Sequence, residues 1–252
     1  LFLTLFIVLV STSGLYQIIQ QKKLSEIKTD FINNMSHEFK TPIATINLAL
    51  DAISNPKTKL IPEKVERYVS MIREENSRML TQVENVLRIS QLERSNNPIK
   101  MSKVDLHAII KDAISHIELM LNDKSGSLTK KLKASNVEVL GNKSHLTNIT
   151  VNLLDNALKY CDSNPKIIVE TFNEDGDFVL KVTDNGLGMS PVVQKKIFDK
   201  FYRATSGNIH NVKGHGLGLA YVKKIVDIHK GEIKLESKEN HGTTFEIKLP
   251  LE

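Results

Sequence analysis

Two stretches of helical periodicity dominate the first 90 residues of the chain. Residues 20–53 contain no glycine and a single proline, Pro42, and their apolar side chains recur every three or four positions, as on one face of an α-helix. This stripe consists of Phe31, Met35, Phe39, Ile43, Ile46, Leu50 and Ile53. After the helix-breaking segment "SNPKTKLIP", a second stripe consists of Val65, Val69, Ile72, Met79, Val83 and Val86. One hairpin buries only one stripe against another, so we expect two copies to form a dimeric four-helix bundle.

The first 19 residues, "LFLTLFIVLVSTSGLYQII", are mostly apolar. A membrane-spanning helix needs about 20 such residues. Lys22 and Lys23 follow, which by the positive-inside rule places the rest of the chain in the cytoplasm. We therefore expect residues 1–19 to be the end of a transmembrane helix. A signal peptide is the alternative, but no basic segment precedes the run. Because the chain begins with Leu1, we expect it to be a piece of a longer protein.

The second half alternates between helical and strand-like patterns. The polar segment "ERSNNPIKMSK" predicts a domain boundary near Ser95, between domains 20–95 and 96–252. Predicted helices span residues 105–121, 142–161, 190–198 and 216–230, and predicted strands span residues 127–133, 137–140, 166–172, 178–184, 231–237 and 242–250. Asn142 is a suitable N-cap, and Gly231 is placed to close the last helix. The order predicts an α+β sandwich, one mixed sheet with helices on one face.

Composition restricts the partners. The 252 residues carry a formal charge of +5, and the lysines are scattered as pairs rather than gathered in a long basic run. We therefore expect no nucleic-acid partner. The single cysteine, Cys161, excludes an internal disulfide, and we expect it to be a small core residue.

The segment "DNGLGM" begins at Asp184, directly after a predicted strand. Gly186 and Gly188 would let a ligand approach the backbone closely, and the carboxylate of Asp184 could accept a hydrogen bond from an exocyclic amine. A simple turn at the end of the strand is the alternative.

The segment "GHGLGLA" spans Gly214 to Ala220 and opens a predicted helix. The free N–H groups of a helix start favour phosphate. The segment is not the dinucleotide fingerprint, because Leu219 stands where a third glycine would be, and it is not a P-loop, because no Gly-Lys-Ser/Thr follows. The polar stretch "ATSGNIHNV" before it is typical of a mobile lid.

The segment "NLLDNALKY" places Asn152, Asn156 and Lys159 on one helix face. Two amides and an ammonium could bind a hydrated Mg²⁺ ion and phosphate oxygens. A polar face in contact with solvent is the alternative.

The segment "NNMSHEFKTPIATI" contains His37 two residues after Met35 and two before Phe39. At about 100° per residue, His37 lies roughly opposite the apolar stripe, so we expect it to face water. An ordinary surface histidine is the alternative. Pro42 removes a helical hydrogen bond close to this histidine.

In this order, over residues 22–252, these motifs resemble those of the sensor histidine kinases of two-component systems. "MSHEFKTPI" resembles the H box of that family, "NLLDNALKY" the N box, "DNGLGM" the G1 box, "IFDKFYR" the F box, "GHGLGLA" the G2 box and "GTTF" the G3 region. The resemblance implies a Bergerat-fold ATP-binding domain behind the dimeric helical hairpin. It also implies ATP and Mg²⁺ as cofactors, and a response regulator as partner.

The resemblance also assigns catalytic roles. His37 would be the nucleophile that accepts the γ-phosphoryl group of ATP, and Glu38 would be its general base or orienting group. Thr41 would position a water for dephosphorylation of the regulator. Arg203 would stabilise charge on the γ-phosphate.

The implied nucleotide-binding residues follow the remaining motifs. Asn156 would bind Mg²⁺ with help from Asn152, Lys159 would contact phosphate, Tyr160 would line the nucleotide site, and Asp184 would bind the adenine amine beside Gly186 and Gly188. Gly214, Gly216, Leu217 and Gly218 would cradle phosphates, and Thr243 and Thr244 would close the adenine side.

The implied function is that of a kinase of the cell membrane with its catalytic part in the cytoplasm, which also dephosphorylates its regulator. Three alternatives stay open. One is an ATPase like gyrase or heat-shock chaperones, although those carry a catalytic Glu where Asn152 stands. The second is a membrane scaffold that has lost catalysis. The third is a kinase-fold protein that acts mainly as a phosphatase.

Overall fold

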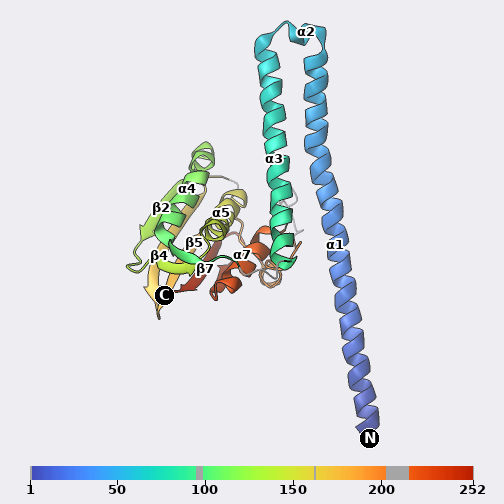
Figure 1. Cartoon of the computed structure of the whole chain (residues 1–252), viewed down its shortest axis with the longest axis vertical. Coiled ribbons are helices and arrows are strands. Elements are labelled where there is room, and N and C mark those ends of the chain that lie inside the picture. The colour runs from blue at the N-terminus through green and yellow to red at the C-terminus, as the bar shows by residue number, and fades with distance from the viewer. Residues whose placement is uncertain (1, 95–98, 162, 203–215, 252) are drawn as a thin grey trace. The chain divides into compact units, whose positions relative to one another are not determined.

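The computed structural model of the chain describes residues 2–94, 99–161, 163–202 and 216–251 (Figure 1). The chain divides into two compact units, residues 1–93 and residues 94–252.

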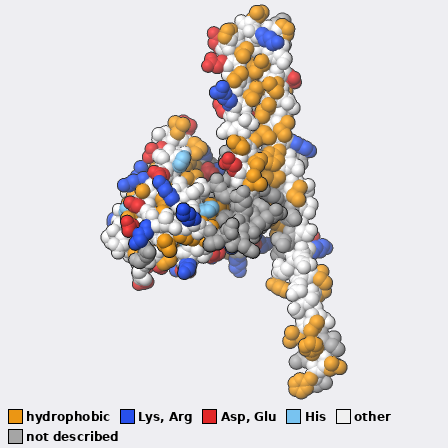
Figure 2. All heavy atoms as spheres, viewed as in Figure 1, with side chains coloured by type: hydrophobic (Ala, Val, Ile, Leu, Met, Phe, Trp, Pro, Cys, Tyr) orange, Lys and Arg blue, Asp and Glu red, His pale blue; other side chains and the backbone are white. Residues whose placement is uncertain are grey.

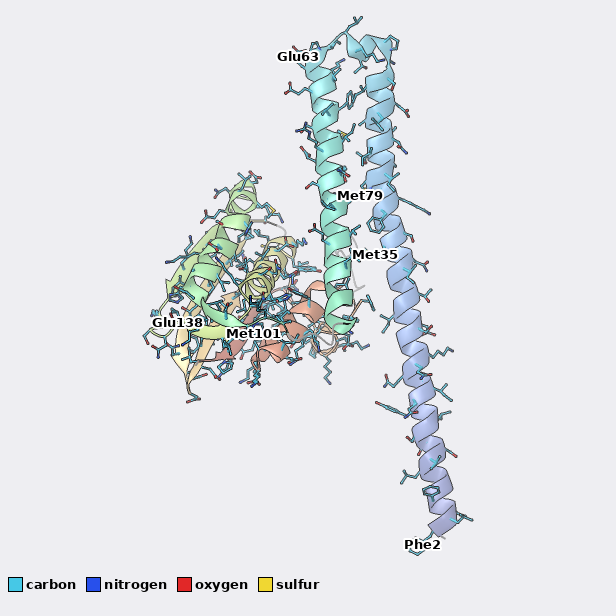
Figure 3. All side chains as sticks on the ribbon, in the orientation of Figure 1. Phe2, Met35, Glu63, Met79, Met101 and Glu138 are labelled. Carbon is cyan, nitrogen blue, oxygen red and sulfur yellow. The ribbon has the colours of Figure 1, made fainter. Side chains whose placement is uncertain are left out.

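The first unit consists of two long helices joined by a short one. Helix α1 spans Phe2–Ser54 and continues through Pro42, α2 spans Pro56–Lys59, and α3 spans Pro62–Arg94. Met35 on α1 is 7% exposed and Ala49 is 1% exposed, which an isolated helix could not achieve. The helices therefore fold back on each other, and Figure 3 marks Met35 on α1 and Met79 on α3. The predicted helical hairpin is confirmed.

The buried face of α1 differs from the predicted stripe at two positions. The covered residues from Met35 onward, buried or half-buried, are Met35, Phe39, Pro42, Thr45, Ile46, Ala49, Ala52 and Ile53. Pro42 and Ala49 take the places expected for their neighbours Ile43 and Leu50, which are 45% and 48% exposed. Met35, Pro42 and Ala49, the buried members of this set, lie seven residues apart, and a seven-residue repeat suits two packed helices. Figure 2 shows apolar side chains on the surface of this hairpin.

The start of α1 is apolar. Within the described residues, one helical segment, Phe2–Ile27, is long and apolar enough to cross a membrane, with a mean hydropathy of 1.9. A signal sequence shares this length and composition. The segment extends beyond the predicted residues 1–19.

The second unit is a sheet covered by helices. Its five strands lie in the order β2 (Ser127–Leu132), β4 (Lys166–Glu174), β5 (Asp177–Thr183), β7 (Thr243–Pro250) and β6 (Glu232–Ser237). β2 and β4 are parallel and the other neighbours are antiparallel. Helices α4 (Leu106–Asp123), α5 (Lys143–Lys159) and α7 (Gly218–Ile228) cover one face (Figure 1). The predicted α+β sandwich with a mixed sheet is confirmed.

The apolar core lies between this sheet and the helices. Val182, Phe245 and Ile247 alternate with more exposed residues along β5 and β7, and all three are buried. Leu153 and Leu154 of α5 and Ile225 of α7 are also buried. The polar residues of α5 that the sequence singled out are therefore held on a helix with a firmly packed opposite side.

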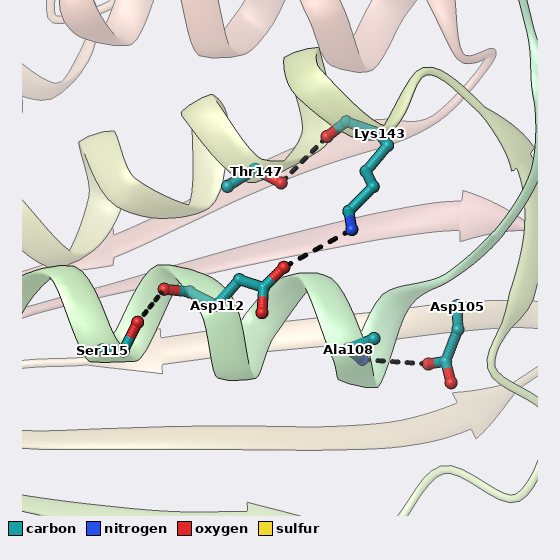
Figure 4. A network of polar contacts seen from close by, with 6 residues as sticks. All are labelled: Asp105, Ala108, Asp112, Ser115, Lys143 and Thr147. Atoms are coloured by element: carbon teal, nitrogen blue, oxygen red, sulfur yellow. Dashed lines mark hydrogen bonds and ion pairs between the residues drawn. The ribbon is translucent and has the colours of Figure 1, made fainter.

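Polar contacts fix the starts of α4 and α5. The carboxylate of Asp105 accepts a hydrogen bond from the Ala108 amide at 3.0 Å and caps α4, as Figure 4 shows. Asn142 caps α5, as predicted, by accepting from the His145 amide at 3.1 Å. An ion pair of 3.6 Å between Lys143 on α5 and Asp112 on α4 links the two helices (Figure 4).

Opposite charges run in register across the outer face of the sheet. In strand order, the directly paired residues are Lys131, Glu170, Lys181, Glu246 and Lys234. Each lysine thus has only glutamates as direct neighbours in this row, and the Lys131–Glu170 pair is 3.0 Å long. Cross-strand pairs of opposite charge favour this register.

Three local features differ from the predictions. Strand β1 (Ser102–Asp105), which pairs antiparallel with β3 (Glu138–Gly141), was not predicted because it is short and contains one apolar residue. Helix α6 spans only Pro191–Gln194 and ends before the predicted residue 198. At the end of α7, the left-handed residue is Lys230, with φ of 57°, rather than Gly231. Gly231 instead donates its amide to the Val226 carbonyl at 2.9 Å.

Candidate functional site

Helix α5 carries three of the predicted nucleotide-binding side chains. Asn152 and Asn156 are half-buried, and the side-chain Nδ2 atom of Asn152 donates to the Asn148 carbonyl at 2.9 Å. Lys159, in the last turn, forms an ion pair with Asp155 one turn earlier. The ammonium group of Lys159 is thus neutralised by a carboxylate on its own helix.

Asp184 follows β5 and turns its carboxylate back toward the protein. Its Oδ1 atom accepts hydrogen bonds from the Gly186 amide at 2.8 Å and from the Thr243 amide at 3.1 Å. Burial raises the pKa of this carboxyl group, and the two amide hydrogen bonds oppose that shift. Both bonds use the same oxygen, so Oδ2 offers an acceptor to a donor such as an exocyclic amine.

Gly186 brings the loop after β5 against the end of α5. A Cβ atom at Gly186 would lie 2.5 Å from the Tyr160 carbonyl oxygen, which no side chain could tolerate. The same carbonyl accepts the Leu187 amide at 2.9 Å. The residues predicted from "DNGLGM" and the end of "NLLDNALKY" therefore meet directly.

Two glycines join this loop to the turn between β6 and β7. Gly188 has φ of 63° and Gly242 has φ of 88°, values that favour glycine. A Cβ at Gly188 would lie 1.9 Å from the Lys238 carbonyl oxygen, and one at Gly242 would lie 2.0 Å from that of Asp184. Gly242 was not among the predicted site residues, although its place in an Asn-His-Gly turn before a strand was a usable signal.

The start of α7 approaches α5 at Asn152. A Cβ at Gly218 would lie 2.9 Å from the Asn152 Oδ1 atom. The N-cap residue, Leu217, is buried, and its apolar side chain makes no capping bond to the first amides of α7. Gly216, with φ of 65°, accepts the Phe201 amide through its carbonyl at 2.9 Å. A helix start beside an amide side chain suits an anion such as phosphate.

Two histidines hold α5 and α7 together. His145 Nδ1 lies 2.8 Å from the Tyr221 hydroxyl. His229 accepts the Asn142 amide through Nε2 at 3.0 Å, and its Nδ1 lies 2.7 Å from the Ile225 carbonyl. Burial lowers the pKa of His229, and its bond to the carbonyl opposes the shift. The neutral ring, with one nitrogen accepting and one donating, fits both partners.

Thr243 and Thr244 lie on opposite faces of the sheet. Thr243 is buried on the helix side, and its Oγ1 lies 3.0 Å from the Ser237 hydroxyl. The hydroxyl of Thr244 lies 3.0 Å from that of Thr183, and alternation along β7 turns it away from the helices. The structure brings Thr243 to Asp184 and does not bring the Thr244 side chain there.

The remaining predicted residues are placed only in part. His37 and Glu38 belong to α1, but their side chains lie outside the described part of the structure, and Arg203 and Gly214 lie outside the described residues. Thr41 is exposed on α1.

Sequence reasoning also missed Asn185, whose Oδ1 accepts the Lys166 amide at 2.7 Å and fixes the loop after β5.

The sandwich brings amides of α5, the carboxylate after β5 and the start of α7 together in one unit, an arrangement that suits a nucleotide. Residues 141–252 match the family described as histidine kinase-, DNA gyrase B- and HSP90-like ATPase. Residues 27–95 match the His Kinase A (phospho-acceptor) domain. The chain belongs to the sensor histidine kinases of two-component systems. The match over residues 27–95 disfavours the gyrase-like alternative, which left the histidine-bearing hairpin unexplained.

Curated relatives agree with this assignment. The chain is 44% identical over 239 residues to the sensor protein RprX of Bacteroides fragilis, covering 94% of this chain and 46% of that protein. It is 32% identical over 238 residues to drug sensory protein A of Synechocystis, covering 90% of this chain and 36% of that protein. The chain thus spans less than half the length of these two relatives.

Solved structures agree with the fold. The mycobacterial sensor histidine kinase MprB matches with a TM-score of 0.51 and 27% identity, covering 60% of this chain and 97% of that structure. The histidine kinase ThkA, solved in complex with the response regulator protein TrrA, matches with a TM-score of 0.63 and 21% identity, covering 92% of this chain and 64% of that structure.

Proposed function

We propose that this chain is the catalytic part of a sensor histidine kinase that transfers the γ-phosphoryl group of ATP to His37. The phosphoryl group then passes to an aspartate of a response regulator. The observation that carries this proposal is the meeting of three motif segments in one unit. Gly186 lies against the Tyr160 carbonyl, and Gly218 lies against the Asn152 amide. In this proposal, residues 20–95 form the phosphotransfer domain and residues 96–252 the ATP-binding domain.

The transfer step uses residues of both domains. A ring nitrogen of His37 forms a bond to the γ-phosphorus while the bond from that phosphorus to the bridging oxygen breaks, and ADP leaves with the electron pair. Glu38 takes the proton that the ring nitrogen loses. Arg203 stabilises the charge on the transferred group.

The described residues suit ATP with a lightly held Mg²⁺ ion. Among the described residues, no group of three His, Cys, Asp or Glu side chains could hold a metal. Mg²⁺ commonly binds through few protein ligands, with waters and phosphate oxygens completing the set. Asn156, assisted by Asn152, would supply amide oxygens. Lys159 would contact phosphate after release from Asp155, and Asp184 would accept from the adenine amine.

Incubation of the full chain in detergent with γ-³²P-labelled ATP tests the proposed function. We expect label on the protein in Mg²⁺ and none when EDTA replaces Mg²⁺. The label should be lost in acid and kept in base, because the expected bond is a phosphoramidate. A chain that stays unlabelled in Mg²⁺, or that carries acid-stable label, would contradict a histidine kinase.

We also propose that the hairpin forms a homodimeric four-helix bundle. Ile43 and Leu50 on α1 are 45% and 48% exposed, and Val69 and Val83 on α3 are 39% and 41% exposed. Ile43 and Leu50 are seven residues apart, and Val69 and Val83 are fourteen apart, so each pair lies on one face of its helix. Such a repeated apolar face is expected to be covered by a second hairpin.

Replacement of Ile43 and Leu50 by glutamate should separate the dimer. The two side chains are exposed within one chain, so the helices should persist while the like charges oppose pairing. We expect the double variant to sediment as a monomer at concentrations where the unchanged chain is a dimer, with a loss of affinity of about a hundredfold or more. Leu119→Glu, at an exposed leucine of α4, is the control and should stay dimeric. If the double variant stayed dimeric, the face with Ile43 and Leu50 would not be the dimer interface.

Membrane anchoring and regulator dephosphorylation complete the proposal. The candidate membrane segment, Phe2–Ile27, and His37 lie on the same continuous helix α1, so a movement of the segment could reach the H box directly. The catalytic part would lie in the cytoplasm, at the inner face of the cell membrane. The solved complex of ThkA with a response regulator supports a regulator as partner. Thr41, exposed on α1, would serve in dephosphorylation.

A further inference from the structure

The carbonyl groups at the end of α5 and directly after it accept hydrogen bonds from two sides. Lys124, directly after α4, donates from Nζ to the Leu158 carbonyl at 2.8 Å and to the Cys161 carbonyl at 3.2 Å. The Tyr160 carbonyl, which lies between these two in sequence, accepts the Leu187 amide at 2.9 Å. A cation that binds the terminal carbonyls of a helix interacts favourably with the helix dipole.

Lys124 is itself firmly placed. The amide of Lys124 donates to carbonyls at the end of α4, and the next turn packs on the loop before β4. The Ser127 amide donates to the Pro165 carbonyl at 2.8 Å, and a Cβ at Gly126 would lie 2.9 Å from the same oxygen. The ammonium group is therefore presented to α5 by a rigid turn.

We propose that Lys124 is a positioning residue for the adenine side of the nucleotide site. It holds the end of α5 so that the Tyr160 carbonyl meets Leu187 and Gly186. The Gly186 amide in turn donates to Asp184 Oδ1 at 2.8 Å. Lys124 thus acts on the carboxylate that would select adenine, through backbone contacts and without touching the nucleotide. The inference rests on the proposed function.

The experiment measures the dissociation constants of ADP and GDP for the full chain in detergent. Lys124→Met removes both donated bonds and keeps the apolar stem. We expect it to weaken ADP binding about tenfold and GDP binding much less, so that the preference for adenine falls. At saturating ATP, the rate of His37 labelling should change less than about twofold, because the phosphate side is untouched. Lys124→Arg can donate to both carbonyls and should restore ADP affinity.

Two controls separate positioning from general destabilisation. Thr171→Val removes the 2.8 Å contact of the Thr171 hydroxyl with His107 Nε2, near the opposite end of α4, and should lower the melting temperature without changing either dissociation constant. Lys130→Met removes an exposed ion pair with Glu118 and should change neither the dissociation constant of ADP nor that of GDP. If Lys124→Met does not fold, Lys124→Gln keeps one neutral donor and should weaken ADP binding about threefold.

The outcomes test the role of Lys124 and the proposed nucleotide-binding function separately. Unchanged ADP affinity in Lys124→Met, or in the Gln variant where it is used, would overturn the role of Lys124. Equal weakening in Thr171→Val, or equal loss of ADP and GDP affinity, would overturn it as well. A wild-type chain that binds no ADP would instead overturn the proposed function.

Discussion

Replacement of His37 by glutamine should abolish labelling of the chain by γ-³²P-ATP. Glutamine has a similar length and polarity but no ring nitrogen that can form a bond to phosphorus, so the loss should be about a thousandfold or more. ADP should still bind with unchanged affinity, because the residues proposed to bind it lie on α5, α7 and the loop after β5 in the other compact unit. The measurements are acid-labile label per chain and the dissociation constant of ADP.

His116→Gln is the matched control for this prediction. His116 is exposed on α4, and its replacement should leave labelling at the wild-type level. Label that survives His37→Gln, or that is lost equally in His116→Gln, would show that the nucleophile has been assigned to the wrong residue. Loss of label together with loss of ADP affinity would point to a folding defect instead.

The helical hairpin could be predicted because its signal is periodic and long. The three- and four-residue spacing of apolar side chains identified both helices and the turn between them. The same spacing could not show which of two adjacent residues on α1 is buried against the other helix. Pro42 and Ala49 are buried where Ile43 and Leu50 were expected. Which residue of such a pair is covered depends on how closely two helices approach, and that is set by residues far apart in sequence.

The candidate site could be predicted where its signals are local. Glycines with left-handed φ, an aspartate after a strand and amides one turn apart all occur within single segments, and the structure brings Asp184, Gly186 and Tyr160 together as expected. Lys124 was missed because its partners lie in another segment, whereas the local signal for Gly242, an Asn-His-Gly turn before a strand, was not used. The Thr244 side chain was expected at the site, but the pleat of β7 turns it to the face opposite Thr243.

Replacement of Asp184 by asparagine should remove nucleotide binding and leave the fold intact. The asparagine carbonyl can accept the Gly186 and Thr243 amides in place of Oδ1. The NH₂ group would replace Oδ2, and a donor would then face the amine of adenine, which is also a donor. We expect ADP affinity to fall by about a hundredfold or more. Titration of the full chain with ADP measures this loss.

The melting temperature of Asp184→Asn tests the role of this carboxylate independently of ADP binding. Burial raises the pKa of Asp184 in the folded protein above its unfolded value. A raised pKa means that Asp184 contributes most to stability below the unfolded pKa, and this contribution is lost as pH rises through the folded pKa. At neutral pH, Asp184→Asn removes a charge that burial disfavours, so the melting temperature should be equal to that of the wild type or higher.

Asp177→Asn separates these two effects from a general response to charge loss. Asp177 begins β5, the strand that Asp184 follows, and is half-buried. Its replacement should leave ADP affinity unchanged. If Asp184→Asn lost affinity together with a large fall in melting temperature, the carboxylate would be a structural group of the loop. If it kept affinity and stability, adenine would have to be recognised elsewhere. Only loss of binding in a stable protein agrees with an Oδ2 atom that faces the nucleotide while Oδ1 holds the loop.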